Sequence, residues 1–291
     1  MVSSDRLNFN GSGCSDNMEK SKELPQKACG IIDSHAHVVT EFFGEEREEV
    51  IKRSFESGVV QMVNPGVVLN NIDELKDIAE RHSNLFFATG LHPHEAKDWN
   101  DECAEQIERA SAHPKSVGVG ECGLDFYYNN SDHESQKRAF AAQCRLAKKI
   151  GKPVIVHCRD AWQEVFDILK EEGAGTEADS LKGVFHCFTG GPEHLSRIAE
   201  LGFYVSFSGI VTFPNAKALQ QAAIQVPEDK ILVETDCPFL APQKVRGSKN
   251  EPRYVWYVAE KLAELRSSSV EAIAQSAMSN TRKLFALPEP Q

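Results

Sequence analysis

The chain has 291 residues, of which 41% are hydrophobic and 26% are charged, and its formal net charge is −11. That length and composition indicate a soluble globular protein with one substantial core, and a single barrel domain commonly needs about 250 residues. The acidic balance excludes a protein that coats nucleic acid nonspecifically, but it leaves open a local phosphate site built from metal ions.

The sequence also limits where the protein works. It contains no run of about 18 apolar residues, so we expect no membrane span, and residues 1–29 lack the apolar stretch of a secretory signal. Its eight cysteines are scattered without a C-x-x-C pair, which favours reduced thiols. We therefore expect a cytoplasmic protein, or a nuclear one if its source is eukaryotic, rather than a secreted one. The sequence leaves the oligomeric state open, and a monomer is compatible with it.

Regular structure is expected to begin near Gly30, after a polar tail over residues 1–29 that is rich in Ser, Asn, Gly and Lys. From there short apolar runs alternate with stretches of helical period. Each run is short and apolar enough to be a strand buried on both faces of a parallel sheet. The predicted strands cover residues 30–38, 59–64, 85–91, 116–121, 153–158, 183–187, 203–208 and 231–236.

The predicted helices lie between these strands and after the last one. They cover residues 45–57, 71–82, 101–111, 132–150, 160–172, 193–201, 215–225, 252–265 and 269–285. Asn71 and Ser131, each followed three residues later by Glu, are the predicted caps of the helices that start there. Eight strand–helix units predict a single (β/α)8 barrel over residues 30–287 rather than an open, doubly wound sheet.

Ionisable side chains stand at the predicted carboxyl ends of five strands, where barrel enzymes place their chemistry. His35 and His37 are two residues apart, so strand alternation directs both to one face. The other members are Glu121, His157, His186 and Asp236. A lone histidine is more often packed or exposed than a ligand, but a group of this size in a barrel mouth is costly to bury unless it is paired or metal-bound. Four imidazoles and two carboxylates suffice for two ions that share a bridge.

Four other histidines and one further carboxylate are assigned no ligand role. His82, His113, His133 and His194 lie in or beside predicted helices, and we expect them to be exposed. Glu234 alternates with Asp236 along the last strand, which leaves open a supporting contact to a ligand or substrate, or a buried structural hydrogen bond.

At these positions the chain resembles the TatD-type metal-dependent deoxyribonucleases, a branch of the amidohydrolase-like barrels. The resemblance spans about residues 30–285 and rests on six motifs in order: Asp33–His37 (DSHAH), Gly90–His94 (GLHPH), Gly120–Asp125 (GECGLD), His157–Ala161 (HCRDA), His186–Gly190 (HCFTG) and Glu234–Pro242 (ETDCPFLAP). Asn250–Pro252 and Asn280–Thr281 extend the match toward the end of the chain.

The resemblance implies a site with two divalent ions. His35, His37 and Asp236 would hold one ion, His157 and His186 the other, and Glu121 would bridge both. Relatives that resemble phosphotriesterases typically bridge with a carboxylated lysine, a position taken here by Glu121. The ions are expected to be Mg²⁺, Mn²⁺ or Zn²⁺, because imidazoles suit Zn²⁺ or another transition metal whereas nuclease activity in the family is usually linked to Mg²⁺ or Mn²⁺.

The resulting hypothesis is metal-assisted hydrolysis of a phosphodiester, with 3′–5′ exonuclease action on single-stranded DNA, or RNA, as the expected activity. The acidic balance favours strand ends or short single strands over long duplex. Glu121 and Asp236 are the catalytic candidates on the ions, Asp236 by orienting or deprotonating the attacking water. Similar proteins suggest that His92 is a catalytic residue that contacts the scissile phosphate without binding a metal ion. The alternative is a structural histidine beside Pro93.

Cations and aromatic residues on the same rim are the candidate substrate contacts. The chosen cations are Arg159, Lys249 and Arg253, with Lys244 and Arg246 as further loop cations, although such a group also fits solvated charge. Lys249 stands where the family often has Arg, which replaces a bidentate fork by a point charge. Phe126, Tyr127 and Tyr128 follow the fourth strand, where they can stack an unpaired base, while core packing is an equal alternative for Phe126.

Two other functions compete with the nuclease hypothesis. The same metal site serves ester or amide hydrolysis, including removal of a D-amino acid from tRNA, because a carbonyl and a phosphoryl oxygen are polarised by the same ions. A metal-bound scaffold without turnover belongs to a different class, and the complete ligand set argues against it.

Overall fold

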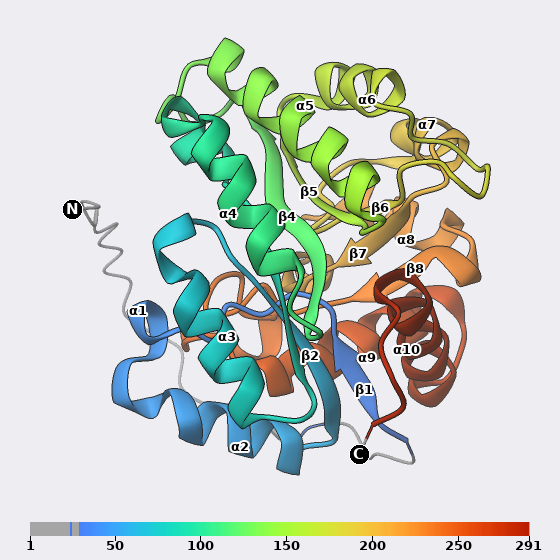
Figure 1. Ribbon diagram of the computed structural model, residues 1–291. Coiled ribbons are helices and arrows are strands. Elements are labelled where there is room, and N and C mark those ends of the chain that lie inside the picture. The colour runs from blue at the N-terminus through green and yellow to red at the C-terminus, as the bar shows by residue number, and fades with distance from the viewer. Residues whose placement is uncertain (1–23, 25–28, 291) are drawn as a thin grey trace, which may run out of the picture.

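The computed structural model describes Leu24 and residues 29–290. Its centre is a parallel eight-stranded sheet in which the strands follow one another in chain order, with helices on the outside (Figure 1). The strands are β1 (Ile31–Asp33), β2 (Val59–Pro65), β3 (Leu85–Thr89), β4 (Ser116–Asp125), β5 (Val154–Arg159), β6 (Gly183–Phe185), β7 (Tyr204–Phe207) and β8 (Ile231–Val233).

The sheet is nearly closed into a barrel, because the first and last strands also meet. The Ser34 N–H donates to the Val233 carbonyl at 3.1 Å, and the Asp236 N–H donates to the His35 carbonyl at 2.9 Å. These bonds leave the sheet without an open edge on this side. The predicted (β/α)8 barrel is confirmed.

The helices follow the strands as predicted, with ends that differ by a few residues. They are α1 (Thr40–Phe43), α2 (Arg47–Glu56), α3 (Ile72–Arg81), α4 (Asp101–Ser111), α5 (His133–Ile150), α6 (Trp162–Glu171), α7 (Leu195–Glu200), α8 (Lys217–Gln225), α9 (Val255–Arg266) and α10 (Val270–Phe285). The short helix α1 was not predicted. Within the described residues, no helix is long and apolar enough to cross a membrane.

The predicted cap at Asn71 is confirmed in position but makes no capping hydrogen bond, and the predicted cap at Ser131 is wrong by one residue. Asn71 precedes α3, but its side chain makes no capping hydrogen bond. At α5 the cap is Asp132 rather than Ser131, and its carboxylate accepts the Ser135 N–H at 2.9 Å. Ser131 is engaged elsewhere, because its hydroxyl donates to the His94 carbonyl at 2.7 Å. A competing tertiary hydrogen bond has shifted the cap by one residue.

The core has two layers. The larger one packs the helices against the outside of the barrel. The smaller one fills the barrel interior with side chains from all eight strands, from the end of α10 and from Leu287 just after it: Ile32, Val63, Phe86, Ala88, Val117, Ile155, Val184, Tyr204, Leu232, Leu284, Phe285 and Leu287. This apolar plug occupies the interior at one end, so polar residues that follow the strands gather at the other.

The predicted tail, residues 1–29, lies largely outside the described residues. Leu24 and Cys29 are the described members, and both pack against the outer core layer. The domain boundary at residue 30 therefore stays a prediction.

Candidate metal centre

Glu121 occupies the middle of β4, which is longer than predicted and continues to Asp125. The pairing of β4 with β5 shifts register between Val119 and Cys122, and such an irregularity re-aims the side chain within it. Close packing fixes the position, because a Cβ on Gly90 would lie 2.5 Å from the Gly120 Cα. Glycine at both positions lets β3 approach β4 beside Glu121.

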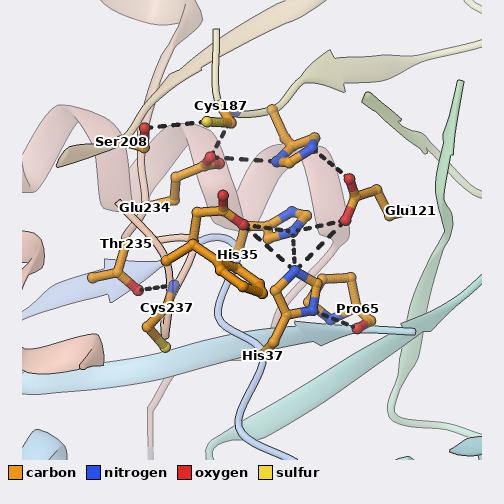
Figure 2. A network of polar contacts seen from close by, with 12 residues as sticks. His35, His37, Pro65, Glu121, Cys187, Ser208, Glu234, Thr235 and Cys237 are labelled. Carbon is orange, nitrogen blue, oxygen red and sulfur yellow. Dashed lines mark hydrogen bonds and ion pairs between the residues drawn. The ribbon is translucent and has the colours of Figure 1, made fainter. Parts of the chain in front are cut away.

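One carboxylate oxygen of Glu121 faces the pair of histidines that follows β1. Oε2 lies 3.4 Å from His35 Nε2 and 3.6 Å from His37 Nε2, and these two nitrogens are 3.1 Å apart. Asp236 Oδ1 approaches the same nitrogens at 3.6 and 3.5 Å. Figure 2 shows Glu121, His35 and His37 converging on one point.

The other oxygen of Glu121 faces His157, which lies within β5, and His186, which follows β6. Oε1 lies 2.9 Å from His157 Nδ1 and 2.9 Å from His186 Nε2. The His186 ring also stacks on His35, with centroids 3.9 Å apart. Glu121 therefore stands between two groups of donor atoms, one for each of its oxygens.

His92 touches this cluster in a different way. Its Nδ1 accepts the His94 N–H at 3.2 Å, so the neutral ring carries its proton on Nε2. That Nε2 lies 3.4 Å from Glu121 Oε1. Burial lowers the pKa of His92 to about 4, against the opposing charge of Glu121. His92 is thus a neutral hydrogen-bond donor beside the cluster.

Three carboxylates hold the cluster in place, and sequence reasoning gave a possible supporting role to Glu234 alone. Asp125 Oδ2 lies 3.2 Å from His157 Nε2 and Glu234 Oε1 lies 3.4 Å from His186 Nδ1. Asp33 accepts both the His35 N–H and the Thr235 N–H on Oδ1, at 3.2 and 3.0 Å. The signal for Asp125 was its place four residues after Glu121, which puts it at the end of the same strand.

The two central carboxylates are held ionised. Burial by itself raises the pKa of Glu121, but the charge of His186 and the hydrogen bonds from His157 and His186 hold that pKa well below its usual range. Burial also raises the pKa of Asp236, and the hydrogen bond from His37 and the charges of His35 and His186 bring it below its ordinary value. The cluster therefore sets two ionised carboxylates among histidine rings.

The donor atoms fit a divalent ion. In the neutral His37 ring, Nδ1–H donates to the Pro65 carbonyl at 3.2 Å, which leaves the lone pair on Nε2. That lone pair faces three other donor atoms at 3.1–3.6 Å. Ligand atoms about 2.0–2.2 Å from a tetrahedral ion lie about 3.4 Å apart. The spacing of the four donors matches that expectation.

The strand ends differ from the predicted ones where the cluster forms. β1 ends at Asp33 and β8 at Val233, so His35, His37 and Asp236 follow the strands. Residues two apart on a strand share a face, as predicted for Glu234 and Asp236. Asp236 instead lies after the end of β8 and has φ 56°, a left-handed conformation that takes it out of this strand pattern. The two carboxylates accordingly reach different histidines.

The four histidines that were assigned no ligand role lie outside the cluster. They were expected to be exposed, but three of them are only partly exposed. His82 and His113 pair with surface glutamates, and His194 stacks on Trp162. His133 is exposed and stacks on Phe126, which packs partly against the core.

The rim cations have separate surroundings. The Arg159 guanidinium lies over the ring of Tyr127, and Lys249 donates to the Phe42 carbonyl. Arg253 Nε lies 2.9 Å from Glu251 Oε2, a carboxylate that also accepts two hydrogen bonds from Arg53. Arg159 and Lys249 therefore stand beside residues of the mouth, whereas the contacts of Arg253 tie it to α2.

Two further cations of the loop after β8 are engaged with neighbours. Lys244 pairs with Glu260 at 2.6 Å, and the Arg246 guanidinium lies 5.0 Å from the centroid of Phe213. Their contacts in the described part of the chain do not include the histidine–carboxylate cluster.

Fold and site together define a barrel protein with a candidate metal centre at the carboxyl end of its strands. The family described as TatD related DNase matches residues 32–286. The chain therefore belongs to this family of metal-dependent hydrolases.

The chain is similar to several members along nearly their whole length. It is 41% identical to the uncharacterized metal-dependent hydrolase YabD of Bacillus subtilis, with 88% of this chain and 98% of YabD covered. It is 31% identical to the 3′-5′ ssDNA/RNA exonuclease TatD of Shigella flexneri, with 88% and 99% covered. The crystal structure of YJJV, a TatD homolog from Escherichia coli, superimposes with a TM-score of 0.81 at 30% identity, covering 89% of this chain and 99% of the other.

Proposed function

We propose that this protein is a divalent-metal-dependent phosphodiesterase that removes nucleotides from the 3′ end of single-stranded DNA, and of RNA by the same chemistry. One observation carries the proposal: Glu121 presents Oε2 to His35 and His37 and Oε1 to His157 and His186. A carboxylate between two sets of ligands is suited to a two-ion hydrolytic site. The strand polarity and substrate follow the names of relatives such as the Shigella flexneri exonuclease.

The ligand assignment follows the two sides of Glu121. His35, His37 and Asp236 would hold one ion and His157 and His186 the other, with Glu121 shared. The candidate ions are Mg²⁺, Mn²⁺ and Zn²⁺, because imidazole-rich sites favour transition metals and phosphate chemistry also uses Mg²⁺.

Side chains around the ions perform the remaining work. When bound, two divalent ions supply charge stabilisation to phosphate oxygens and favour ionisation of water near neutral pH. Asp236 is ionised, so it orients the attacking water and accepts its proton. His92 is neutral at pH 7 and offers its Nε2–H to a phosphate oxygen beside Glu121. Arg159 and Lys249 neutralise charge on the bound strand.

Digestion of 3′- and 5′-labelled single-stranded oligonucleotides across a metal panel tests the proposal. We expect stepwise loss from the 3′ end with the native chain and no turnover with Glu121→Ala or Asp236→Asn, both folded. His113→Ala removes a histidine outside the cluster and, purified in parallel, controls for contaminating nuclease. Retained turnover in Glu121→Ala would contradict the assignment. Turnover of a D-aminoacyl-tRNA in place of oligonucleotides would redirect it to ester hydrolysis.

A further inference from the structure

Exposed aromatic rings are concentrated at the carboxyl end of the barrel. Among the described residues, four large hydrophobic side chains are strongly exposed: Tyr127 (57%), Tyr128 (46%), Phe239 (49%) and Ile224 (43%). The first three follow β4 and β8, the strands that carry Glu121 and lead to Asp236, whereas Ile224 lies on the outer helix α8. Apolar surface gathered beside a reactive site indicates a binding role.

The two tyrosines are joined to one side of the metal centre. Their N–H groups donate to Asp125 Oδ1 at 3.0 and 2.9 Å, while Asp125 Oδ2 contacts His157. The Tyr128 ring lies 5.5 Å from that of His94, which also bonds Asp125. The same carboxylate therefore positions the tyrosine backbone and a candidate ligand on the Oε1 side of Glu121.

A cation covers this pair of rings. The Arg159 guanidinium lies 4.0 Å from the centroid of Tyr127 and 4.9 Å from that of Tyr128. In the described part of the chain it forms no ion pair with a carboxylate. Its charge is available to a phosphate, and both its plane and the tyrosine rings suit a nucleobase.

A second aromatic wall stands on the other side of the centre. The rings of Phe42 and Phe239 meet edge to face at 5.3 Å, and they lie 6.0 and 6.3 Å from the His37 ring. Lys249 lies 4.7 Å from the centroid of Phe43 and donates to the Phe42 carbonyl. On this side the cation lies over a buried ring, Phe43, and is tied to the backbone of Phe42, whose ring contacts the exposed Phe239.

We propose that the mouth carries two stacking sites for unpaired nucleobases, one at Tyr127 and Tyr128 and the other at Phe239 with Phe42, so that a single strand crosses the centre with one base against each wall. Arg159 and Lys249 contact the adjoining phosphates. This inference rests on the proposed function and names how that site selects its substrate.

The arrangement selects single strands for a physical reason. Every base has a face that stacks on an aromatic ring, so stacking binds a strand with little regard to its sequence. In a duplex those faces are covered by neighbouring base pairs, and both walls would stay empty until the end is unpaired. With a net charge of −11, the chain offers a duplex little overall electrostatic attraction to compensate for that loss.

Oligonucleotides with one abasic nucleotide test each wall separately. The abasic residue is placed on one side or the other of the scissile 3′ phosphodiester, and kcat/KM is measured for the native protein, for Tyr127→Ala/Tyr128→Ala and for Phe239→Ala. Loss of one stacked base should lower kcat/KM about 5- to 100-fold. On the intact strand, the kcat/KM of each wall variant should fall by the same factor. In each variant an abasic nucleotide at one of the two positions should cause no further fall in kcat/KM, and that position should differ between the two variants.

Matched variants separate stacking from other effects. Tyr127→Phe and Tyr128→Phe keep the rings and should therefore keep the native sensitivity to the abasic nucleotide at both positions. Ile224→Ala removes an exposed apolar side chain on the outer helix α8, outside both walls, and should leave kcat/KM unchanged. Thermal unfolding of each variant verifies the fold. If both wall variants keep the native sensitivity at both positions, the inference is overturned.

A binding assay distinguishes this inference from the proposed function. The metal-loaded protein is titrated with a phosphorothioate single strand that contains 2-aminopurine beside its 3′ end. Quenching that is lost in Tyr127→Ala/Tyr128→Ala or Phe239→Ala supports the walls even if no hydrolysis is found. If the wall variants show unaltered quenching while the native protein hydrolyses the strand, the stacking sites are refuted and the proposed function stands. If the metal-loaded native protein does not bind the strand, the stacking sites are refuted outright.

Discussion

Asp125 Oδ2 lies 3.2 Å from Nε2 of His157, whose Nδ1 lies 2.9 Å from Glu121. The histidine is thus held between two carboxylates, one outside the cluster and one at its centre. Burial raises the pKa of Asp125, but the bonds from His157 and His94 and the Tyr128 N–H hold it well below its usual range. An ionised carboxylate behind a ligand histidine fixes the ring and raises its basicity.

Asp125→Asn should therefore weaken metal binding while leaving the fold intact. Loss of such a supporting carboxylate typically costs about 10–100-fold in metal affinity or activity. Calorimetric titration of the metal-free protein with Mn²⁺ or Zn²⁺ measures the change. Asp132→Asn, which keeps a competent cap at the start of α5, is the matched control. An unchanged affinity in Asp125→Asn would show that His157 needs no such support.

Glu234→Ala should destabilise the fold as well as disturb His186. Glu234 is fully buried and its Oε1 accepts the Cys187 N–H at 2.6 Å, so truncation leaves that donor without a partner. The expected loss is about 1–3 kcal/mol in the free energy of unfolding, measured in urea. Glu234→Gln retains an accepting oxygen and should lose less. Equal losses in the two variants would argue that the charge, rather than the hydrogen bond, matters.

Metal ions should raise the thermal stability of the native chain through Glu121. An ion present at about 100 times its dissociation constant stabilises the folded state by about 2.7 kcal/mol. Differential scanning calorimetry with and without chelator measures the accompanying rise in Tm. Glu121→Ala should show a much smaller rise, because it removes a donor shared by both groups of histidines. A rise of the same size in that variant would place the ions elsewhere.

Glu251→Ala should act on stability and leave turnover unchanged. Arg53 donates two hydrogen bonds to Glu251 at 2.7 and 2.8 Å, which ties the loop after β8 to α2. Because Glu251 is largely buried, breaking the pair should cost about 1–3 kcal/mol. Urea unfolding of Glu251→Ala, Arg53→Ala and the double variant should show losses that do not add. A large fall in kcat with native stability would assign this motif to the substrate.

Periodicity made the barrel predictable. Short apolar runs such as 59–64 and 85–91 have the length and composition of buried parallel strands, and the eight units are local patterns that need no knowledge of the tertiary contacts. Boundaries were less predictable, because the hydrogen bonds that end a strand come from its neighbours. β1 is the clearest case: after Asp33 the Ala36 N–H bonds to β2 and the His37 N–H to the segment after β8.

The sequence by itself determined which chemical groups meet at the barrel mouth, since residues at the carboxyl ends of parallel strands converge wherever the fold is a barrel. The tertiary structure alone decided how they are divided. The register shift in β4 turns Glu121 so that each oxygen faces a different pair of histidines, and the left-handed backbone at Asp236 brings it to His35 and His37. Asp125 became a support for His157 for the same reason: its partner comes from the neighbouring strand, 32 residues away, and no local pattern encodes that contact.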